Sequence, residues 1–189
     1  MRNTFSLILT AACVLCGTAA HAQDTNAPRT KLELLETQTN AVIVMAHTLT
    51  GTVFAQSATV SVICKESIDA ASGRKEHGLA IGVKQGDQPE EVNIVDYDEL
   101  DSLLVAVDFV SKVDAKVTEL PEFDVVYRTR DEFKVFSYTS NLRVGVIQAG
   151  LQGGHQFKTR VLLSPDQLTQ FKTLIQQAKG KLDQLRAKK

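Results

Sequence analysis

The sequence has few cysteines and no long apolar run beyond its first residues. Cys13, Cys16 and Cys64 are the only cysteines in 189 residues, too few for the disulfide framework of a small secreted toxin. After residue 22 no apolar run reaches about 18 residues, so we expect no membrane span. With 43% hydrophobic and 23% charged residues, the composition is that of a globular protein and excludes a collagen and a disordered tail.

Motifs that carry catalysis or bind metal ions are also missing from the sequence. His47, His77 and His155 do not have the spacing that would place two zinc ligands on one helical face. There is no Gly-x-Ser-x-Gly elbow, and the glycine-rich segment 150–155 lacks the lysine and the following helix of a phosphate-binding loop. We therefore predict no catalytic residue, no metal and no cofactor. A hydrolase with a site built from loops near His77 or His155 is kept as an alternative.

The first 22 residues have the pattern of a secretory signal. Arg2 supplies a positive charge, an apolar run follows from Phe5 to Leu15, and Ala20-His21-Ala22 is a small-residue cleavage motif. We expect cleavage after Ala22 and a secreted or periplasmic location. A lipoprotein modified at Cys13 or Cys16 is the less favoured reading, because Leu15 stands before Cys16 where a small residue is expected.

Removal of that leader would leave Cys64 as the single cysteine. Cys64 alternates with Val60 and Val62 on one face of a predicted strand, which favours a buried thiol over an intermolecular disulfide. Residues 23–30 are polar and contain a proline, so we expect a flexible mature N-terminus there.

The first folded unit is predicted to span residues 31–120. Period-two alternation indicates strands at residues 42–46, 60–64, 79–83 and 92–95, separated by turn signals. A helix should follow, with Asp96 as N-cap and Glu99 completing a capping-box-like pair. Its apolar positions recur at helical spacing: Leu100, Leu103, Leu104, Val107, Val110 and Val113.

The second unit, residues 121–189, repeats the same order of elements. Strands are predicted at residues 123–129, 133–139, 142–148 and 157–163, with the glycine-rich segment 150–155 read as a hairpin loop. Ser164 should cap a helix that has Pro165 at its first position and Gln167 completing the capping box. The two helix starts are 68 residues apart, which indicates a structural duplication.

The sequence therefore predicts an α+β fold of two successive ββββα units, with antiparallel sheets covered by two helices in one compact domain. This order of elements resembles the Whirly-type architecture of single-stranded-DNA-binding proteins over most of the mature chain. The Lys-Gly-Lys-Ala-Ala-Leu signature of that family is absent here. The resemblance therefore implies a fold and transfers no functional residue.

Charge is divided unevenly between the two units. Residues 23–114 contain 7 basic and 15 acidic side chains, whereas residues 115–189 contain 13 basic and 7 acidic ones. Such an asymmetry can hold the two halves together, drive association of an acidic surface with a basic one, or mark an anion-binding surface.

Strand alternation in the basic unit gathers cations and aromatic rings on one face of the second sheet. If Tyr127, Val135 and Val161 face the core, the other face carries the candidate ligand-binding residues Arg128, Arg130, Lys134, Phe136, Tyr138, Arg143, Lys158 and Arg160. Phosphates attract positive charge and bases stack on rings, so this pattern is typical of a surface for a polyanion or a single-stranded nucleic acid. The plainer reading is a solvated sheet face, and we favour it.

An acidic cluster at the start of the first helix has two readings as well. Asp96, Asp98, Glu99 and Asp101 provide oxygen atoms that calcium could use, but Leu100 interrupts the spacing of a calcium loop. Carboxylates are favoured at a helix N-terminus by its dipole, and this is the preferred interpretation.

The last helix carries a heptad-like apolar seam, formed by Leu168, Phe171, Ile175, Ala178, Leu182 and Leu185. We expect it to dock on a sheet, with a homodimer through this helix as the alternative. The sequence as a whole predicts a secreted or periplasmic, non-catalytic binding or assembly protein whose partner is an unknown protein or an anionic ligand. The alternative is a binder of anionic ligands or polyanions, nucleic acid included, that uses the basic sheet face.

Overall fold

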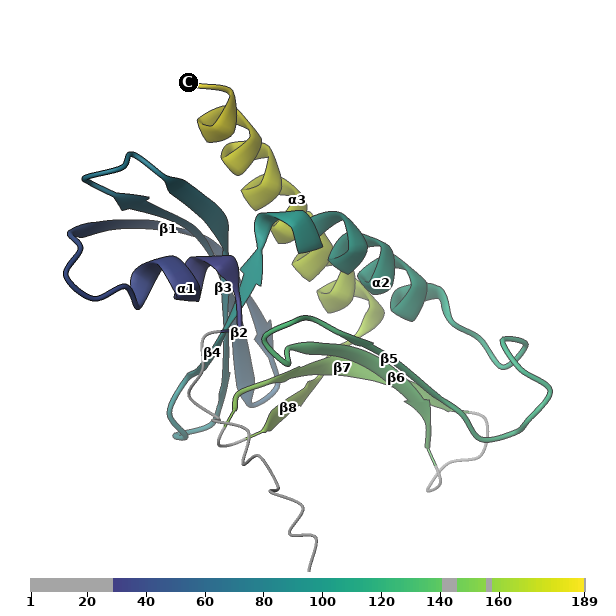
Figure 1. Ribbon diagram of the computed structural model, residues 1–189. Coiled ribbons are helices and arrows are strands. Elements are labelled where there is room, and N and C mark those ends of the chain that lie inside the picture. The colour runs from purple at the N-terminus through teal and green to yellow at the C-terminus, as the bar shows by residue number, and fades with distance from the viewer. Residues whose placement is uncertain (1–28, 141–145, 156–157, 189) are drawn as a thin grey trace, which may run out of the picture.

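Two successive meanders form two antiparallel four-stranded sheets, which we call sheet A and sheet B (Figure 1). The computed structural model describes residues 29–140, 146–155 and 158–188. Strands lie in chain order within each sheet, β1-β2-β3-β4 in sheet A and β5-β6-β7-β8 in sheet B. A helix follows each sheet, so the predicted α+β fold of two ββββα units is confirmed.

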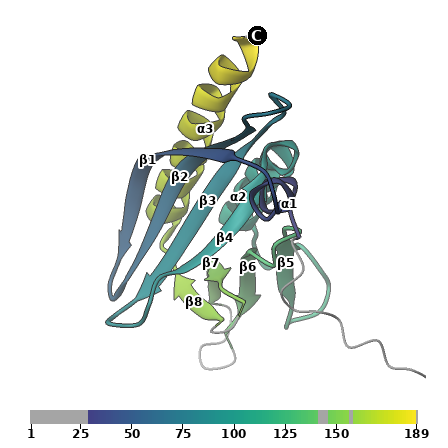
Figure 2. The same ribbon diagram turned by 60° about the vertical axis from the view of Figure 1, so that its left-hand side comes forward.

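Sheet A is the larger of the two sheets, and Figure 2 shows its strands side by side. Its turns lie where the sequence predicted them, with Gly73 and Gly86 at positive φ. The strands are longer than the sequence indicated because alternation continues into polar residues: β1 (Ile43–Ala55), β2 (Ala58–Asp69), β3 (Lys75–Gln85) and β4 (Glu91–Asp96). A 3₁₀ turn, η1 (Tyr97–Glu99), leads from β4 into the helix α2 (Leu100–Lys112).

Sheet B comprises β5 (Asp124–Arg128), β6 (Lys134–Thr139), β7 (Ile147–Gly153) and β8 (Thr159–Leu162), and the helix α3 (Pro165–Ala187) follows it. The predicted hairpin loop at 150–155 is wrong, because most of this segment belongs to β7. A Cβ at Gly150 would stand 2.1 Å from the carbonyl oxygen of Val161, so glycine allows β8 to approach closely. Most of the strand predicted at 142–148 lies outside the described residues.

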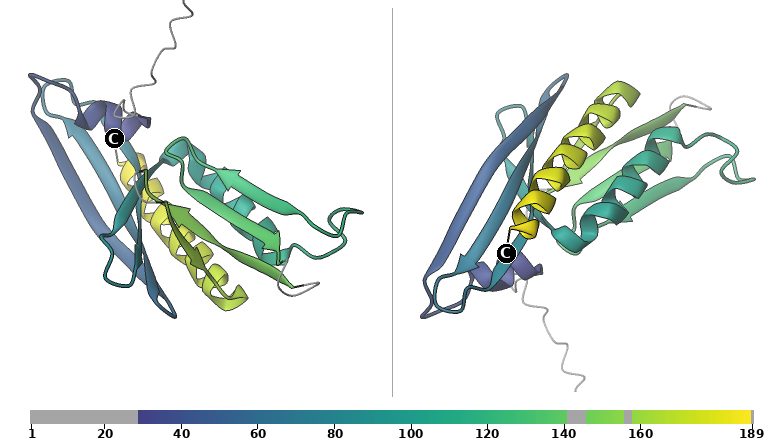
Figure 3. Two further views of the ribbon diagram at one scale, coloured as in Figure 1. Left: turned by 90° about the horizontal axis from the view of Figure 1, so that it is seen from below. Right: turned by 90° about the horizontal axis from the view of Figure 1, so that it is seen from above.

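Each long helix covers the sheet of the other unit. α3 packs against β1 and β2 of sheet A, α2 packs against β5 and β6 of sheet B, and the two helices contact each other (Figure 3). Buried side chains from both units therefore form one core cluster, which includes Val62, Leu79, Leu103, Val135 and Ile175. The exchange of helices explains why the boundary at residues 120 and 121 divides the sequence but not the core.

The seam of α3 lies inside this core. Phe171, Ile175 and Leu182 are fully buried, as expected for a docking helix. These three residues pack within one chain, and the alternative of a homodimer through this helix stays a prediction. The predicted capping box is present, since Ser164 Oγ accepts from the backbone N–H of Gln167 at 3.2 Å and Gln167 Oε1 accepts from that of Ser164 at 2.8 Å.

The sequence did not predict α1 (Lys31–Glu36), which covers part of the other face of sheet A. Leu32 of α1 packs with Ala80 and Ile94 in a second, smaller cluster. Thr30 was assigned to a flexible N-terminus, but it is buried and caps this helix. Six residues are too few for a clear helical period, which is why the sequence pattern missed the element.

Cys64 is buried against α3, as predicted, and its Sγ lies 3.6 Å from the carbonyl oxygen of Ala178. Of the helices in the described ranges, none has both the length and the apolar character that crossing a bilayer requires. The predicted signal peptide, residues 1–22, lies outside the described residues.

Candidate anion-binding surface

The face of sheet B that points away from the helices carries ordered rows of side chains. The strand register places Arg128, Lys134, Gln152 and Arg160 in one row across β5, β6, β7 and β8. The next row contains Val126, Phe136, Gly150 and Leu162. Directly opposite residues on antiparallel strands point to the same face, so the first row brings three cations together.

We call the cations Arg128, Lys134, Lys158 and Arg160 the basic face. The pKa of Lys134 is held below its usual value, first by partial burial and then by repulsion from Arg128 and Lys158. Arg160 adds to this repulsion, whereas Glu132 opposes it. Within the described ranges, Glu132 is the one carboxylate in ion-pair contact with the basic face, at 3.2 Å from Arg128. The described residues therefore neutralise the positive charge of this face only in part.

The aromatic residues lie beside the basic face, as the alternation predicted. The guanidinium carbon of Arg160 lies 4.2 Å from the ring centroid of Phe136 and 5.6 Å from that of Tyr138. Gly150 of β7 lies directly opposite Phe136 and adds no side chain to this face. Phe136 is only 3% exposed, so it does not offer a free surface on which a base could stack.

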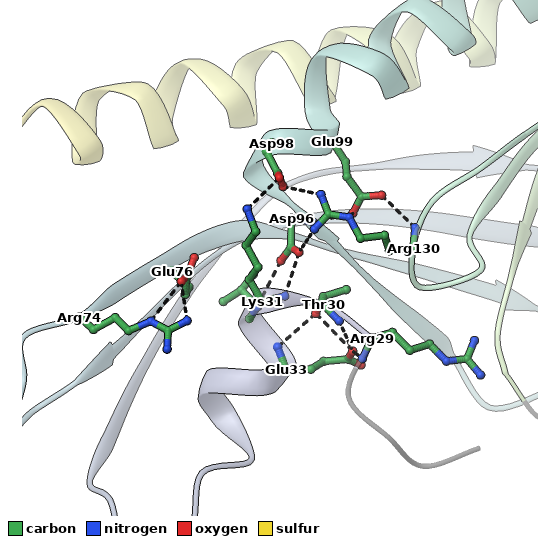
Figure 4. A network of polar contacts seen from close by, with 11 residues as sticks. Arg29, Thr30, Lys31, Glu33, Arg74, Glu76, Asp96, Asp98, Glu99 and Arg130 are labelled. Atoms are coloured by element: carbon green, nitrogen blue, oxygen red, sulfur yellow. Dashed lines mark hydrogen bonds and ion pairs between the residues drawn. The ribbon is translucent and has the colours of Figure 1, made fainter. Parts of the chain in front are cut away.

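The prediction that Arg130 belongs to this face is wrong. β5 ends at Arg128, so the alternation that assigned Arg130 to the outward face does not extend to it. Its guanidinium donates instead to Asp96 Oδ2 and Asp98 Oδ1, both at 2.7 Å (Figure 4). Its backbone N–H donates to Glu99 Oε1 at 2.9 Å. Arg143 lies outside the described residues.

The acidic cluster at the start of α2 joins three parts of the chain. Asp96 accepts the backbone N–H groups of Lys31 and Leu32 at 2.8 and 3.2 Å, and the side chain of Lys31 reaches Asp98 at 2.8 Å. These carboxylates are therefore occupied by Arg130 and by the start of α1 (Figure 4). Asp101 lies 3.6 Å from Lys179 of α3.

Ion pairs between the two units give part of the charge asymmetry a structural role. Besides Arg130, Lys172 of α3 contacts Asp108 of α2 at 2.5 Å. Both pairs join a basic residue of the second unit to an acidic residue of the first, so the asymmetry helps to hold the two halves together.

A buried polar seam joins the edge of β4 to the second unit. Asp131 accepts the backbone N–H of Ile94 at 2.7 Å, and its other oxygen is 2.6 Å from His155 Nε2. Asn93 donates to the carbonyl oxygen of Asp131 and accepts from the backbone N–H of Gly154. Burial raises the pKa of the Asp131 carboxyl. The sequence reasoning missed this seam, because no periodicity relates residues 93, 131 and 155.

The other histidine considered for a hydrolase pairs with a carboxylate as well. His77 Nε2 lies 3.1 Å from Glu66 Oε1 in sheet A. Among the described residues no serine, threonine or cysteine is hydrogen-bonded to His77 or His155. Both pairs therefore lack the bonded nucleophile of a hydrolytic triad in the part of the chain that is described.

Comparison with known proteins adds no relative. No protein-family model matches the chain, and no curated protein and no solved structure does so either. The Whirly-like arrangement therefore stays a prediction about architecture.

Proposed function

We propose that this protein is a secreted or periplasmic, non-catalytic binding protein that holds an anionic ligand on the basic face of sheet B. The observation that carries the proposal is the row of three cations, Arg128, Lys134 and Arg160, that the strand register places on one face of sheet B. Arg128, Lys158 and Arg160 repel the ammonium group of Lys134, and Glu132, which pairs with Arg128, partly opposes this repulsion. A bound anion would relieve this repulsion, which gives a physical reason for affinity.

The position of Phe136 favours recognition by charge over recognition by base stacking. Arg160 lies over the ring, so a nucleic acid base could reach Phe136 only by displacing that cation. We therefore expect sulfated or phosphorylated polyanions to bind with the same affinity as single-stranded DNA of equal charge. Binding should weaken steeply as the salt concentration rises, because each neutralised phosphate releases a counterion.

The experiment compares charge reversals at matched positions. Fluorescence anisotropy with labelled polyphosphate would be measured at low and moderate salt for wild type, Arg160→Glu and Lys158→Glu. Lys181→Glu is the control, because it makes the same change of net charge at an exposed position on α3. We expect roughly tenfold weaker binding for each variant of the basic face, about 1.4 kcal/mol, and little change for Lys181→Glu.

Equal losses in all three variants would show that net charge alone governs binding, and they would contradict a defined site. A labelled oligo(dT) of matched charge tests whether recognition depends on charge or on base stacking. Clearly tighter binding of oligo(dT) than of polyphosphate would favour stacking. Native mass spectrometry of the protein from its own host gives an independent readout. A co-purifying anionic mass that dissociates as salt rises would support the proposal, whereas a bare chain would favour a protein partner.

A further inference from the structure

An apolar groove runs between α2 and the outer edge of sheet B. Its volume is about 520 Å³, and its walls are mainly apolar. Val105 and Phe109 of α2 line one side and are exposed. β5 lines the other with Val125 and Tyr127, which pack against the core, and with the edge of Val126, whose side chain belongs to the opposite face of the sheet. Side chains of this size are usually covered when they lie together, so the groove indicates a surface for a partner.

Among the described residues, no strand lies on the outer side of β5, beside the groove. β5 is an edge strand, with β6 as its one neighbour in sheet B. The backbone N–H of Thr129 donates to the carbonyl oxygen of Phe133, and the carbonyl oxygen of Phe123 accepts from the backbone N–H of Thr139. The odd-numbered residues along β5 therefore direct their backbone hydrogen bonds toward β6. In an antiparallel ladder the alternate residues then point their N–H and C=O groups outward. These residues are Asp124, Val126 and Arg128.

The sequence of β5 complements itself in charge. If two copies of β5 pair antiparallel with Val126 opposite Val126, the outward-pointing Asp124 of each copy faces Arg128 of the other. Opposite charges directly across an antiparallel pair are favourable, and each of these pairs exchanges two backbone hydrogen bonds. We propose that the protein forms a homodimer in which the β5 strands of two copies pair about Val126.

The same two-fold axis would bring the grooves together. An axis through the Val126 pair and perpendicular to the sheets places the helices α2 of both copies on the same side, below the joined edges. Val105 and Phe109 of each copy would then cover those of the other. Sheet B would continue from one copy into the next, and the basic faces of both copies would lie on one surface.

β1, one of the two edge strands of sheet A, is less suited to such pairing. β1 contains an irregularity in its pairing with β2 between Leu49 and Gly51, and irregularities of this kind twist an edge away from a second strand. β1 also has no acidic or basic pair flanking a central apolar residue. It therefore provides a control position: Val44, which is 50% exposed, matches Val126 in residue type and exposure.

The test measures the mass of the full chain as recovered from expressing cells, by sedimentation velocity over a range of concentrations. Wild type and Val44→Arg are expected to be dimers, whereas Val126→Arg and Asp124→Arg are expected to be monomers with unchanged circular dichroism. The double variant Asp124→Arg/Arg128→Asp exchanges the two charges and should recover the dimer. No ligand takes part in the assay, so its result is separate from the fate of the proposed anion binding.

A monomeric wild type would overturn the proposal and leave the β5 edge to a strand of another protein. A dimer that survives Val126→Arg, or one that Val44→Arg abolishes, would place the interface elsewhere. Failure of the double variant to dimerise would contradict the register centred on Val126.

Discussion

Arg130 and Asp96 belong to different ββββα units, yet the guanidinium of Arg130 lies 2.7 Å from the carboxylate of Asp96. Asp96 is almost fully buried and also accepts two backbone N–H groups at the start of α1. The pair therefore joins the loop after β5, the end of β4 and the N-terminal helix.

Arg130→Ala should lower the free energy of unfolding substantially, because it leaves the buried Asp96 without its cation. We expect a loss of about 2 kcal/mol, less than for a fully buried pair, since Arg130 is 39% exposed and solvent screens it. Urea denaturation followed by circular dichroism measures the change. Arg74→Ala is the control, because Arg74 is exposed in its pair with Glu76 and should contribute less than about 0.5 kcal/mol. Similar losses in both variants would contradict the structural role of Arg130.

The packing of α3 in the common core should make its buried side chains important for stability. Phe171 is fully buried and its ring centroid lies 6.2 Å from that of Phe133. Phe171→Ala should cost about 4 kcal/mol of unfolding free energy, measured by urea denaturation, through lost burial and a cavity. The same substitution at Phe54, which is 71% exposed, should change stability by less than about 0.5 kcal/mol. A small effect at Phe171 would mean that α3 does not pack in the core.

Two glycines should respond to alanine in opposite directions. Gly150→Ala places a Cβ against the carbonyl oxygen of Val161 and should destabilise the protein by about 2 kcal/mol. Gly180 lies inside α3 with nothing near its Cβ position, so Gly180→Ala should stabilise by about 1 kcal/mol through helix propensity. Thermal unfolding of both variants measures these two changes in stability. A stabilising Gly150→Ala would show that β7 and β8 do not approach as closely as described.

Asp131 should make stability depend on pH. Because burial raises its pKa above 3.8, the folded protein keeps the Asp131 proton to a higher pH than the unfolded chain does. The favourable contribution of this proton to the free energy of unfolding is complete below pH 3.8, and it is lost as the pH rises through the pKa of Asp131 in the folded protein. Asp131→Asn cannot ionise and keeps an oxygen for the N–H of Ile94, so its stability relative to wild type should increase over that range and then level off.

Urea denaturation at a series of pH values measures this difference. Carboxylates with lowered pKa, such as Asp108 and Asp183, act in the opposite direction in both proteins and cancel in the comparison. A difference that stays constant with pH would contradict a raised pKa at Asp131.

Periodicity predicted the strands and long helices well because their polar and apolar faces are distinct. Val60, Val62 and Cys64 recur at every second position and are buried, and Leu103 and Val107 recur at helical spacing. The same reasoning failed at Gly150, where glycine serves a close strand approach that local sequence cannot reveal. It also failed at α1, which is stabilised by Asp96, more than 60 residues away in the chain.

Strand alternation also predicted part of the candidate site. Alternation placed Arg128, Lys134 and Arg160 correctly, because they lie within regular strands or at their ends. Arg130 follows the last residue of β5, and its direction is decided by carboxylates of the first unit. The aromatic ring of Phe136 lies on the predicted face, but only the structure shows that Arg160 covers it.

The sequence by itself determined the two ββββα units, the turns of sheet A, the burial of Cys64 and the uneven division of charge, because each of these depends on local pattern or composition. The tertiary structure decided which helix covers which sheet, that Arg130 is part of an ion-pair network, and that β5 has an open edge beside an apolar groove. These features depend on residues far apart in the chain, whose contacts arise from the packing of complementary surfaces and not from the order of neighbouring residues.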